Sequence, residues 1–393
     1  MPRVLIHAVV MLVLTAFALT TSSLPPLVTT IATRLKMPVS AFGILFAIQF
    51  AMFAVAAFSS SWLQRRARLH SRSFVLMGLG VLSLTLLSAP LFRSHASLYL
   101  LIVLLGVAGG LVESHGSAVV AALDPGKSGQ YLNLSQAFFC LGGVAAPFTI
   151  GYLFKTSLEW QQMLELFGGL IAVIAILFGV TKTPEIEERG VDESSGTTGT
   201  PVSPRSRGLF ALLSLLMFAY TFSESTVVSW LPSLFEITQG LPKVGAAWLL
   251  SLFWAGVMTS RISLFFLPRS GSMNRVVAGS LLLSAAALGL LWLWRGSSVS
   301  LVLVALAGLA FGPVWPGIVA LTRIVDVRSS SAVGVIGIGG LGAAVGPLAS
   351  GALIGTYGME TVQPILFALA GVQLIVFVLY LRFALAPPRG MHA

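Results

Sequence analysis

Twelve apolar stretches, each long enough to cross a membrane, constrain the fold of this chain more than any other feature of its sequence. A helix needs about 20 apolar residues to span the ~30 Å hydrocarbon core of a bilayer. The sequence therefore predicts an all-α integral membrane protein with twelve transmembrane helices in two groups of six. The stretches lie at residues 5–27, 40–62, 73–92, 97–121, 132–154 and 161–180, and then at 208–231, 245–267, 275–294, 299–322, 332–354 and 362–384.

Composition excludes a soluble protein. Of the 393 residues, 56% are hydrophobic and 9% are charged, whereas a soluble domain carries about 25% charged residues. The 40 glycines suit helices that pack closely in lipid, because small residues let backbones approach. The single cysteine, Cys140, lies inside an apolar stretch, so we expect no internal disulfide and a packing role for this side chain.

One long polar stretch separates the two groups of helices. Residues 181–207 are rich in Ser, Thr, Gly, Pro and charge, and such a segment cannot bury enough apolar surface to fold alone. We interpret it as a tether, with a regulatory segment as the alternative. The predicted domains are an N-terminal six-helix bundle (1–180), a cytoplasmic linker (181–207) and a C-terminal six-helix bundle (208–393).

The basic residues predict the orientation in the membrane, since cytoplasmic loops hold the excess of Lys and Arg. With the N-terminus inside, 17 basic residues, Arg261 among them, fall on the cytoplasmic side and six fall outside. Both termini are therefore predicted to be cytoplasmic, in a multi-pass protein of the cell (inner) membrane. The net charge of +10 reflects this bias, and no nucleic-acid partner is expected.

Two short motifs repeat about half a chain apart. Residues 22–27 (SSLPPL) and 229–234 (SWLPSL) share Ser-x-Leu-Pro-x-Leu, and residues 143–151 and 342–351 share a proline four residues before a glycine. Because both groups begin inside, they are predicted to be parallel repeats, an arrangement that resembles the major facilitator transporters. Pro25 and Pro232 are then expected to end the first helix of each repeat at the outer face, either as part of a gate or as plain helix stops.

Two acidic residues lie at membrane depth. Of thirteen acids, only Glu113 and Glu224 fall well inside the apolar stretches. A charge at a helix centre costs ~2.5–3.5 kcal/mol, so such residues usually face a cavity and carry function. Burial also favours a protonated carboxyl group over a carboxylate. Both are candidate proton-coupling residues, and the alternative is a neutral Glu hydrogen-bonded between helices.

Polar side chains near Glu113 are candidate substrate ligands. Asn133 and Gln136 are three residues apart and share one helix face, and their amides offer donors and acceptors to sugar hydroxyls; helix–helix hydrogen bonding is the alternative. His115 points to a different face from Glu113, so it is either a ligand or an interhelical hydrogen-bonding group. Trp230 and Trp315 are expected on cavity helices, where indole rings stack on the C–H faces of sugars.

At these residues the chain resembles the fucose, glucose and galactose proton symporter branch of the major facilitator superfamily. The resemblance rests on ESHGSAVVAAL (113–123), NLSQAFFCLGGVAAP (133–147), ESTVVSWLPSL (224–234) and PVWPG (313–317). It implies that Glu113 is a coupling or sugar-contacting acid and that Asn133 and Gln136 bind sugar. Two features depart from the branch: the first apolar stretch holds no acid, and the loop SSSWLQRRARLHSR (59–72) lacks the Asp of the superfamily motif.

Three functions compete on these observations. The first is alternating-access transport of a small polar organic solute, sugar-like or polyol-like, coupled to protons and carried out by a monomer. The second is proton antiport that exports a drug-like or amphipathic metabolite, which the sparse polar groups favour. The third is a membrane sensor on the same scaffold. The sequence has no nucleophile–base pair, metal-ligand cluster or phosphate-binding glycine loop, so we expect neither an enzyme nor a cofactor or metal.

Overall fold

The computed structural model describes residues 3–67, 69–124, 127–183, 204–266, 273–294, 298–324 and 329–385, and in these ranges the ordered elements are all helical. The first set of helices comprises α1 (Arg3–Ser23), α2 (Val28–Leu35), α3 (Phe42–Ala67), α4 (Ser71–Leu87), α5 (His95–Ala122), α6 (Ser128–Leu153) and α7 (Trp160–Val180). The second comprises α8 (Pro204–Gln239), α9 (Lys243–Phe266), α10 (Met273–Leu293), α11 (Ser298–Phe311), α12 (Val314–Ile324), α13 (Ser329–Tyr357) and α14 (Val362–Leu385).

Each predicted apolar stretch corresponds to a helical segment. Within the described residues, eleven segments are long and apolar enough to cross a membrane, and α4 is a shorter apolar helix. Two of the eleven are composite: α1 and α2 together form Val4–Leu35, and α11 and α12 together form Val299–Thr322. The prediction of an all-α membrane protein is confirmed.

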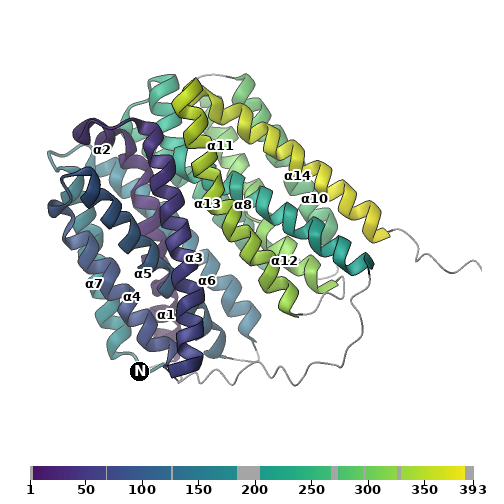
Figure 1. Cartoon of the computed structure of the whole chain (residues 1–393), viewed down its shortest axis with the longest axis horizontal. Helices are drawn as coiled ribbons and strands as arrows, with labels where there is room; N and C mark the ends of the chain where they lie inside the picture. The colour runs from purple at the N-terminus through teal and green to yellow at the C-terminus, as the bar shows by residue number, and fades with distance from the viewer. Residues whose placement is uncertain are drawn as a thin grey trace, which may run out of the picture.

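The two sets of helices pack in the same pattern, as expected of repeats. In the first set, α1 packs on α6, α3 on α5 and α4 on α7; in the second, the equivalent pairs are α8 with α13, α9 with α11 and α10 with α14. The sets form two bundles side by side, joined mainly by α6 against α9 and α3 against α13 (Figure 1). Most of the linker predicted at 181–207 lies outside the described residues, and α8 begins inside its C-terminal end, at Pro204.

Glycines at equivalent places allow the closest contacts within each bundle. A methyl group on Gly110 of α5 would collide with the carbonyl oxygen of Phe53 on α3. A methyl group on Gly308 of α11 would collide in the same way with the carbonyl oxygen of Phe253 on α9. Both bundles therefore rely on backbone contact between helices at this crossing.

We expect Gly110→Ala to destabilise the protein by about 1–3 kcal/mol, because the added methyl group forces the packed helices α3 and α5 apart. The measurement is thermal unfolding of the purified protein in detergent. Gly80→Ala on α4 is the matched control, since a methyl group there meets no atom within 4 Å. Equal unfolding temperatures for the two variants would show that the α3–α5 contact is not tight.

The first proline motif ends α1 at Ser23, as predicted, but the second does not end α8, so the prediction is wrong for Pro232. After Ser23 the chain makes a single 3₁₀ turn, η1 (Pro25–Leu27), and continues as α2; α8 passes through Pro232 without interruption. The difference follows from the missing N–H groups. Pro25 and Pro26 together remove two consecutive donors and tighten one turn, whereas a lone proline in α8 removes one.

The two bundles are in direct contact near one end of the molecule, the end predicted to be extracellular. Gly43 of α3 lies against Gly351 of α13: a Cβ added to Gly43 would lie 2.7 Å from the Cα of Gly351. Nearby, Lys243 on α9 donates a hydrogen bond to Thr30 on α2 (2.6 Å), and Thr29 donates one to Glu236 on α8 (2.7 Å). Toward the other end, where the N-terminus lies, the ribbons of the two bundles diverge (Figure 1).

Candidate functional site

A buried arginine joins the two bundles at membrane depth. The sequence placed Arg261 among the cytoplasmic loop residues, and this assignment is wrong: it lies within α9 and only 7% of it is exposed. Its Nη1 donates to Gln136 Oε1 at 3.3 Å and to Cys140 Sγ at 3.4 Å, both on α6 of the other bundle. A guanidinium keeps its charge in this setting, so the bundle interface contains a fixed cation.

Both predicted membrane carboxyl groups lie in the field of this cation. Glu113 on α5 and Glu224 on α8 belong to different bundles, yet each interacts electrostatically with Arg261. In the part of the chain that the structure describes, Arg261 forms no ion pair within 4.0 Å. The three groups therefore form a loose cluster, without a closed salt bridge.

The surroundings of Glu113 leave it a free acceptor. Gln136, which the sequence placed near Glu113, is close enough to interact with its carboxyl group. The Oε2 atom of Glu113 is buried and has no hydrogen-bond partner among the described residues. Because a buried polar atom without a partner is costly, this oxygen is available to a proton or a ligand.

A break in one span supplies the polar partners on the other side of the cluster. Gly312 and Pro313 lie between α11 and α12. Pro316 has no N–H group, so it cannot donate the helical hydrogen bond to the carbonyl oxygen of Gly312, four residues earlier. Arg261 Nε donates to that carbonyl at 3.4 Å. Tyr220 on α8 donates to Glu224 Oε1 at 2.6 Å and lies 3.2 Å from the carbonyl oxygen of Phe311.

His115 lies apart from this cluster. Its Nε2 is 2.9 Å from Ser60 Oγ, its Nδ1 is 3.4 Å from Ser71 Oγ, and its ring stacks on Phe74 with centroids 4.3 Å apart. These partners belong to α3 and α4, so the interhelical alternative describes His115 in this structure. Asn133 lies on α6 three residues before Gln136, and its side chain is outside the described part of the structure.

The two tryptophans singled out in the sequence lie in different settings. Trp230 is fully buried, donates to Ser350 Oγ at 2.8 Å and meets Phe46 edge-on, so it packs where the bundles touch. Trp315 is partly buried on α12. Sequence reasoning missed Trp254, which lies seven residues before Arg261 on the same face of α9. The available signal was an arginine inside an apolar stretch with a tryptophan seven residues before it, which predicts that both side chains share one helix face.

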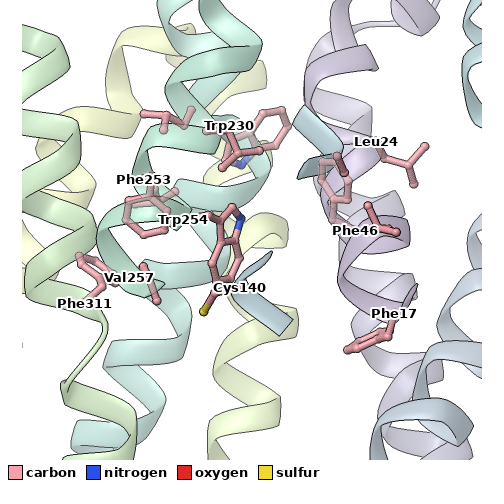
Figure 2. Close-up of a cluster of buried hydrophobic side chains, with 14 of the residues drawn as sticks. Phe17, Leu24, Phe46, Cys140, Trp230, Phe253, Trp254, Val257 and Phe311 are labelled. Carbon is pink, nitrogen blue, oxygen red and sulfur yellow. The ribbon is translucent and has the colours of Figure 1, made fainter. Parts of the chain in front are cut away.

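An aromatic row crosses from one bundle to the other through Trp254. Figure 2 shows Trp254 and Phe253 on the second bundle, with Phe17 on the opposite side. The indole Nε1 of Trp254 is buried without a hydrogen-bond partner among the described residues. The row therefore offers apolar ring faces and one free donor. Neighbouring centroids are 5.5–5.9 Å apart in the order Phe17, Phe139, Trp254, Phe253, Phe311 and Tyr220.

Two helical bundles of matching architecture, with ionisable groups at membrane depth between them, define the structural class of secondary transporters. Comparison with known families gives the particular family. Residues 10–339 match the family model described as the Major Facilitator Superfamily, and the chain belongs to this family.

Known proteins of similar sequence are distant. A "Protein TsgA homolog" of Serratia proteamaculans is 25% identical over 269 residues, 67% of this chain and 65% of that protein. "Bypass of stop codon protein 6" of Saccharomyces cerevisiae is 24% identical over 382 residues, 86% of this chain and 74% of that protein. The chain thus spans just under two thirds of the length of the bacterial relative.

Solved structures share the fold. A bacterial homolog of the human lysosomal transporter Spinster, in an inward-facing and unoccupied conformation, matches with a TM-score of 0.71 at 15% identity, over 97% of this chain and 96% of that one. A mutant of the nucleoside transporter NupG also matches with a TM-score of 0.71, at 14% identity, over 96% of this chain and 99% of that one. At such identities the likeness concerns the fold alone.

Proposed function

We propose that this protein is a proton-coupled secondary transporter that moves a small organic solute across the cytoplasmic membrane by alternating access. The observation that carries the proposal is the position of Arg261, which lies at the bundle interface and interacts electrostatically with Glu113 and Glu224 without a direct ion pair. We further propose that the protein works as a monomer with both termini in the cytoplasm.

The charge balance of this cluster supports coupling to one proton. One guanidinium and two carboxylates carry a net charge of −1, and an uncompensated buried charge is costly. One proton on either carboxyl group restores neutrality. We propose that Glu113 and Glu224 exchange this proton, with Glu113 the nearer to the solute because its Oε2 has no hydrogen-bond partner among the described residues.

The chemistry around the cluster suits a sugar-like or polyol-like solute. Glu113 Oε2 and the Gln136 amide would bind hydroxyl groups, and Asn133 remains a proposed ligand from its place on α6. The ring of Trp254 would pack against a C–H face, and its free Nε1 would donate to a further hydroxyl. Trp315 and Trp230 remain proposals as aromatic contacts at the edges of the site.

The aromatic row favours a second candidate, which is antiport of an amphipathic metabolite against protons. Phe17, Phe139 and Trp254 bring apolar rings from three helices together, and such a wall would bind an apolar body as well as a sugar face. The two candidates differ in the direction of proton movement: symport carries protons with the solute, and antiport carries them against it.

Purified protein in phosphatidylcholine liposomes tests the proposal. Sugars, polyols and amphipathic metabolites are screened for flux with and without an imposed pH gradient, while an internal pH dye follows proton movement. We expect one solute class to move faster with the gradient, together with a matching proton flux whose direction separates symport from antiport. If no solute flux changes when the pH gradient is imposed, the proposal of proton coupling is wrong.

The contacts between the bundles at the predicted outer end support a gate there. Pro25 and Pro232 lie in the helices that approach each other at this end, and each proline removes a helical hydrogen bond and makes local bending less costly. We propose that these positions flex as the outer end opens, which would break the bonds of Lys243 to Thr30 and of Thr29 to Glu236.

Spin labels across this end are expected to report two distance populations. Labels at Thr33→Cys on α2 and Gln239→Cys on α8, in a Cys140→Ser background, should show a short and a long distance whose ratio changes with substrate or pH. A control pair within one bundle, Thr33→Cys with Ala96→Cys on α5, should keep one distance. If the first pair shows one distance that does not change, the outer end does not open at these positions and the two prolines have only a structural role.

A further inference from the structure

A groove between α6 and α9 lies outside the transport cluster except where it reaches Arg261. It has a volume of about 490 Å³, within the ~300–1,000 Å³ range of small-molecule sites. The side chains in it are mostly apolar, with a cation at each of two positions. Its lining includes Lys127, Leu134, Leu141, Met258, Arg261 and Ile262.

An exposed apolar stripe on α6 leads into the groove. Leu134, Leu141 and Phe148 recur every seven residues on α6, and they are 44%, 44% and 54% exposed. At the end of this stripe that is furthest from Lys127, Phe148 stacks on Trp248 of α9, with ring centroids 5.6 Å apart. The groove continues this exposed stripe toward the predicted cytoplasmic end.

The two cationic positions lie at different depths in the half of the groove that is nearer the predicted cytoplasmic surface. Lys127 is the residue before the first residue of α6. Arg261 lies five residues before the end of α9 at Phe266, which is about 7.5 Å along the helix axis. Lys127 therefore lies at headgroup depth. Arg261 lies deeper, because its guanidinium bonds Gln136 and Cys140, which lie further along α6. No acidic side chain is among the described residues that line the groove.

The protein's own contacts leave Arg261 able to donate further hydrogen bonds. Its hydrogen bonds go to a carbonyl oxygen, an amide oxygen and a thiol, at 3.3–3.4 Å. All three acceptors are uncharged groups, and such long bonds are weak. A guanidinium has five donor N–H groups, so the ester oxygens of a lipid in the groove can accept further hydrogen bonds from it.

We propose that this groove binds an anionic phospholipid of the cytoplasmic leaflet. Its phosphate pairs with Lys127, its glycerol linkage extends toward Arg261, and one acyl chain follows Leu134 and Leu141 toward the bilayer centre. The occupant comes from the membrane, because an exposed apolar stripe leads into the groove and Lys127 lies at headgroup depth. Basic pockets between helices on the cytoplasmic side suit anionic headgroups. The bound lipid touches both bundles, because α6 and α9 belong to different ones.

Native mass spectrometry of the purified full-length chain in detergent tests the site. Phosphatidylglycerol and phosphatidylcholine with identical oleoyl chains are added in equal amounts, and the retained lipid is counted. We expect one phosphatidylglycerol to be retained in preference to phosphatidylcholine. Lys127→Gln should weaken this binding about fivefold, and Leu134→Trp should weaken it by filling the groove.

Matched controls separate the groove from general charge and surface effects. Arg382→Gln removes an exposed cation from the last turn of α14, and Leu379→Trp changes a lipid-facing residue that is 47% exposed. Both should retain the lipid as the wild type does. Equal retention of the two lipids, or equal effects of groove and control variants, would overturn the proposal.

A third arm adds octyl phosphate, a soluble amphipathic anion. If it occupies the groove while phosphatidylglycerol shows no preference over phosphatidylcholine, the site belongs to a soluble ligand and the lipid proposal fails. Solute flux in pure phosphatidylcholine vesicles is an independent measurement. The proposed transport function therefore stands or falls separately from this site.

Discussion

Glu113→Gln is expected to abolish accumulation of the solute against its gradient while leaving exchange across the membrane intact. The amide keeps the size and hydrogen-bonding capacity of a neutral carboxyl group but cannot release a proton. With one proton per neutral solute, a pH difference of one unit supports about tenfold accumulation. In the variant this ratio should fall to one, as measured by labelled solute in liposomes with an imposed pH gradient.

The matched control for this variant is Glu165→Gln on α7, which removes an acid that is not part of the Arg261 cluster. It should accumulate solute as the wild type does. Wild-type accumulation by Glu113→Gln would show that Glu113 is a structural residue and that the coupling proton binds elsewhere.

Arg261→Gln is expected to have the second large effect, a loss of transport together with lower stability. Removing one partner from a buried charge cluster typically costs about 3–5 kcal/mol, because the remaining charges lose their compensation. Without the cation, burial favours the protonated form of both carboxyl groups, so we expect the cycle of proton release to stop. Thermal unfolding and solute uptake, measured on the same preparation, report the two effects separately.

Two further variants test whether the charge itself is responsible. Arg261→Lys keeps the cation but loses the planar fork that reaches both α6 and the Gly312 carbonyl, so we expect partial activity. Arg261→Gln combined with Glu224→Gln should recover stability without recovering transport, since it removes a carboxylate along with its cation. Wild-type transport by Arg261→Gln would contradict the proposed coupling cluster.

The sequence predicted the helices well because span length and hydropathy are local properties. It also placed Gln136 near Glu113 and put Glu224 inside an apolar stretch. In the structure, Gln136 contacts one guanidinium and both carboxyl groups lie in the field of that guanidinium. The cation itself was missed. Arg261 lies close to the end of an apolar stretch, and a charge count along the chain assigns such a residue to the adjoining loop.

What the sequence did not predict depends on partners distant along the chain. Arg261 and Gln136 are 125 residues apart, and no local pattern indicates that they meet. His115 shows the same limit, since its depth resembled that of Glu113 but its face of α5 turns toward Ser60 and Phe74. Pro25 and Pro232 had similar sequence contexts, and the extra Pro26 made the local backbone different.

The hydroxyl of Tyr220 has one proton to donate and two acceptors within reach, the Glu224 carboxyl group and the carbonyl of Phe311 at the break between α11 and α12. A carboxylate competes for that proton more strongly than a neutral carboxyl group does. If Glu224 takes up the proposed coupling proton, we expect the Tyr220 hydroxyl to shift toward the Phe311 carbonyl. Proton uptake on α8 would then tighten its contact with the break between α11 and α12, and proton release would loosen it. A single phenol would thus transmit the chemical state of one helix to the shape of another.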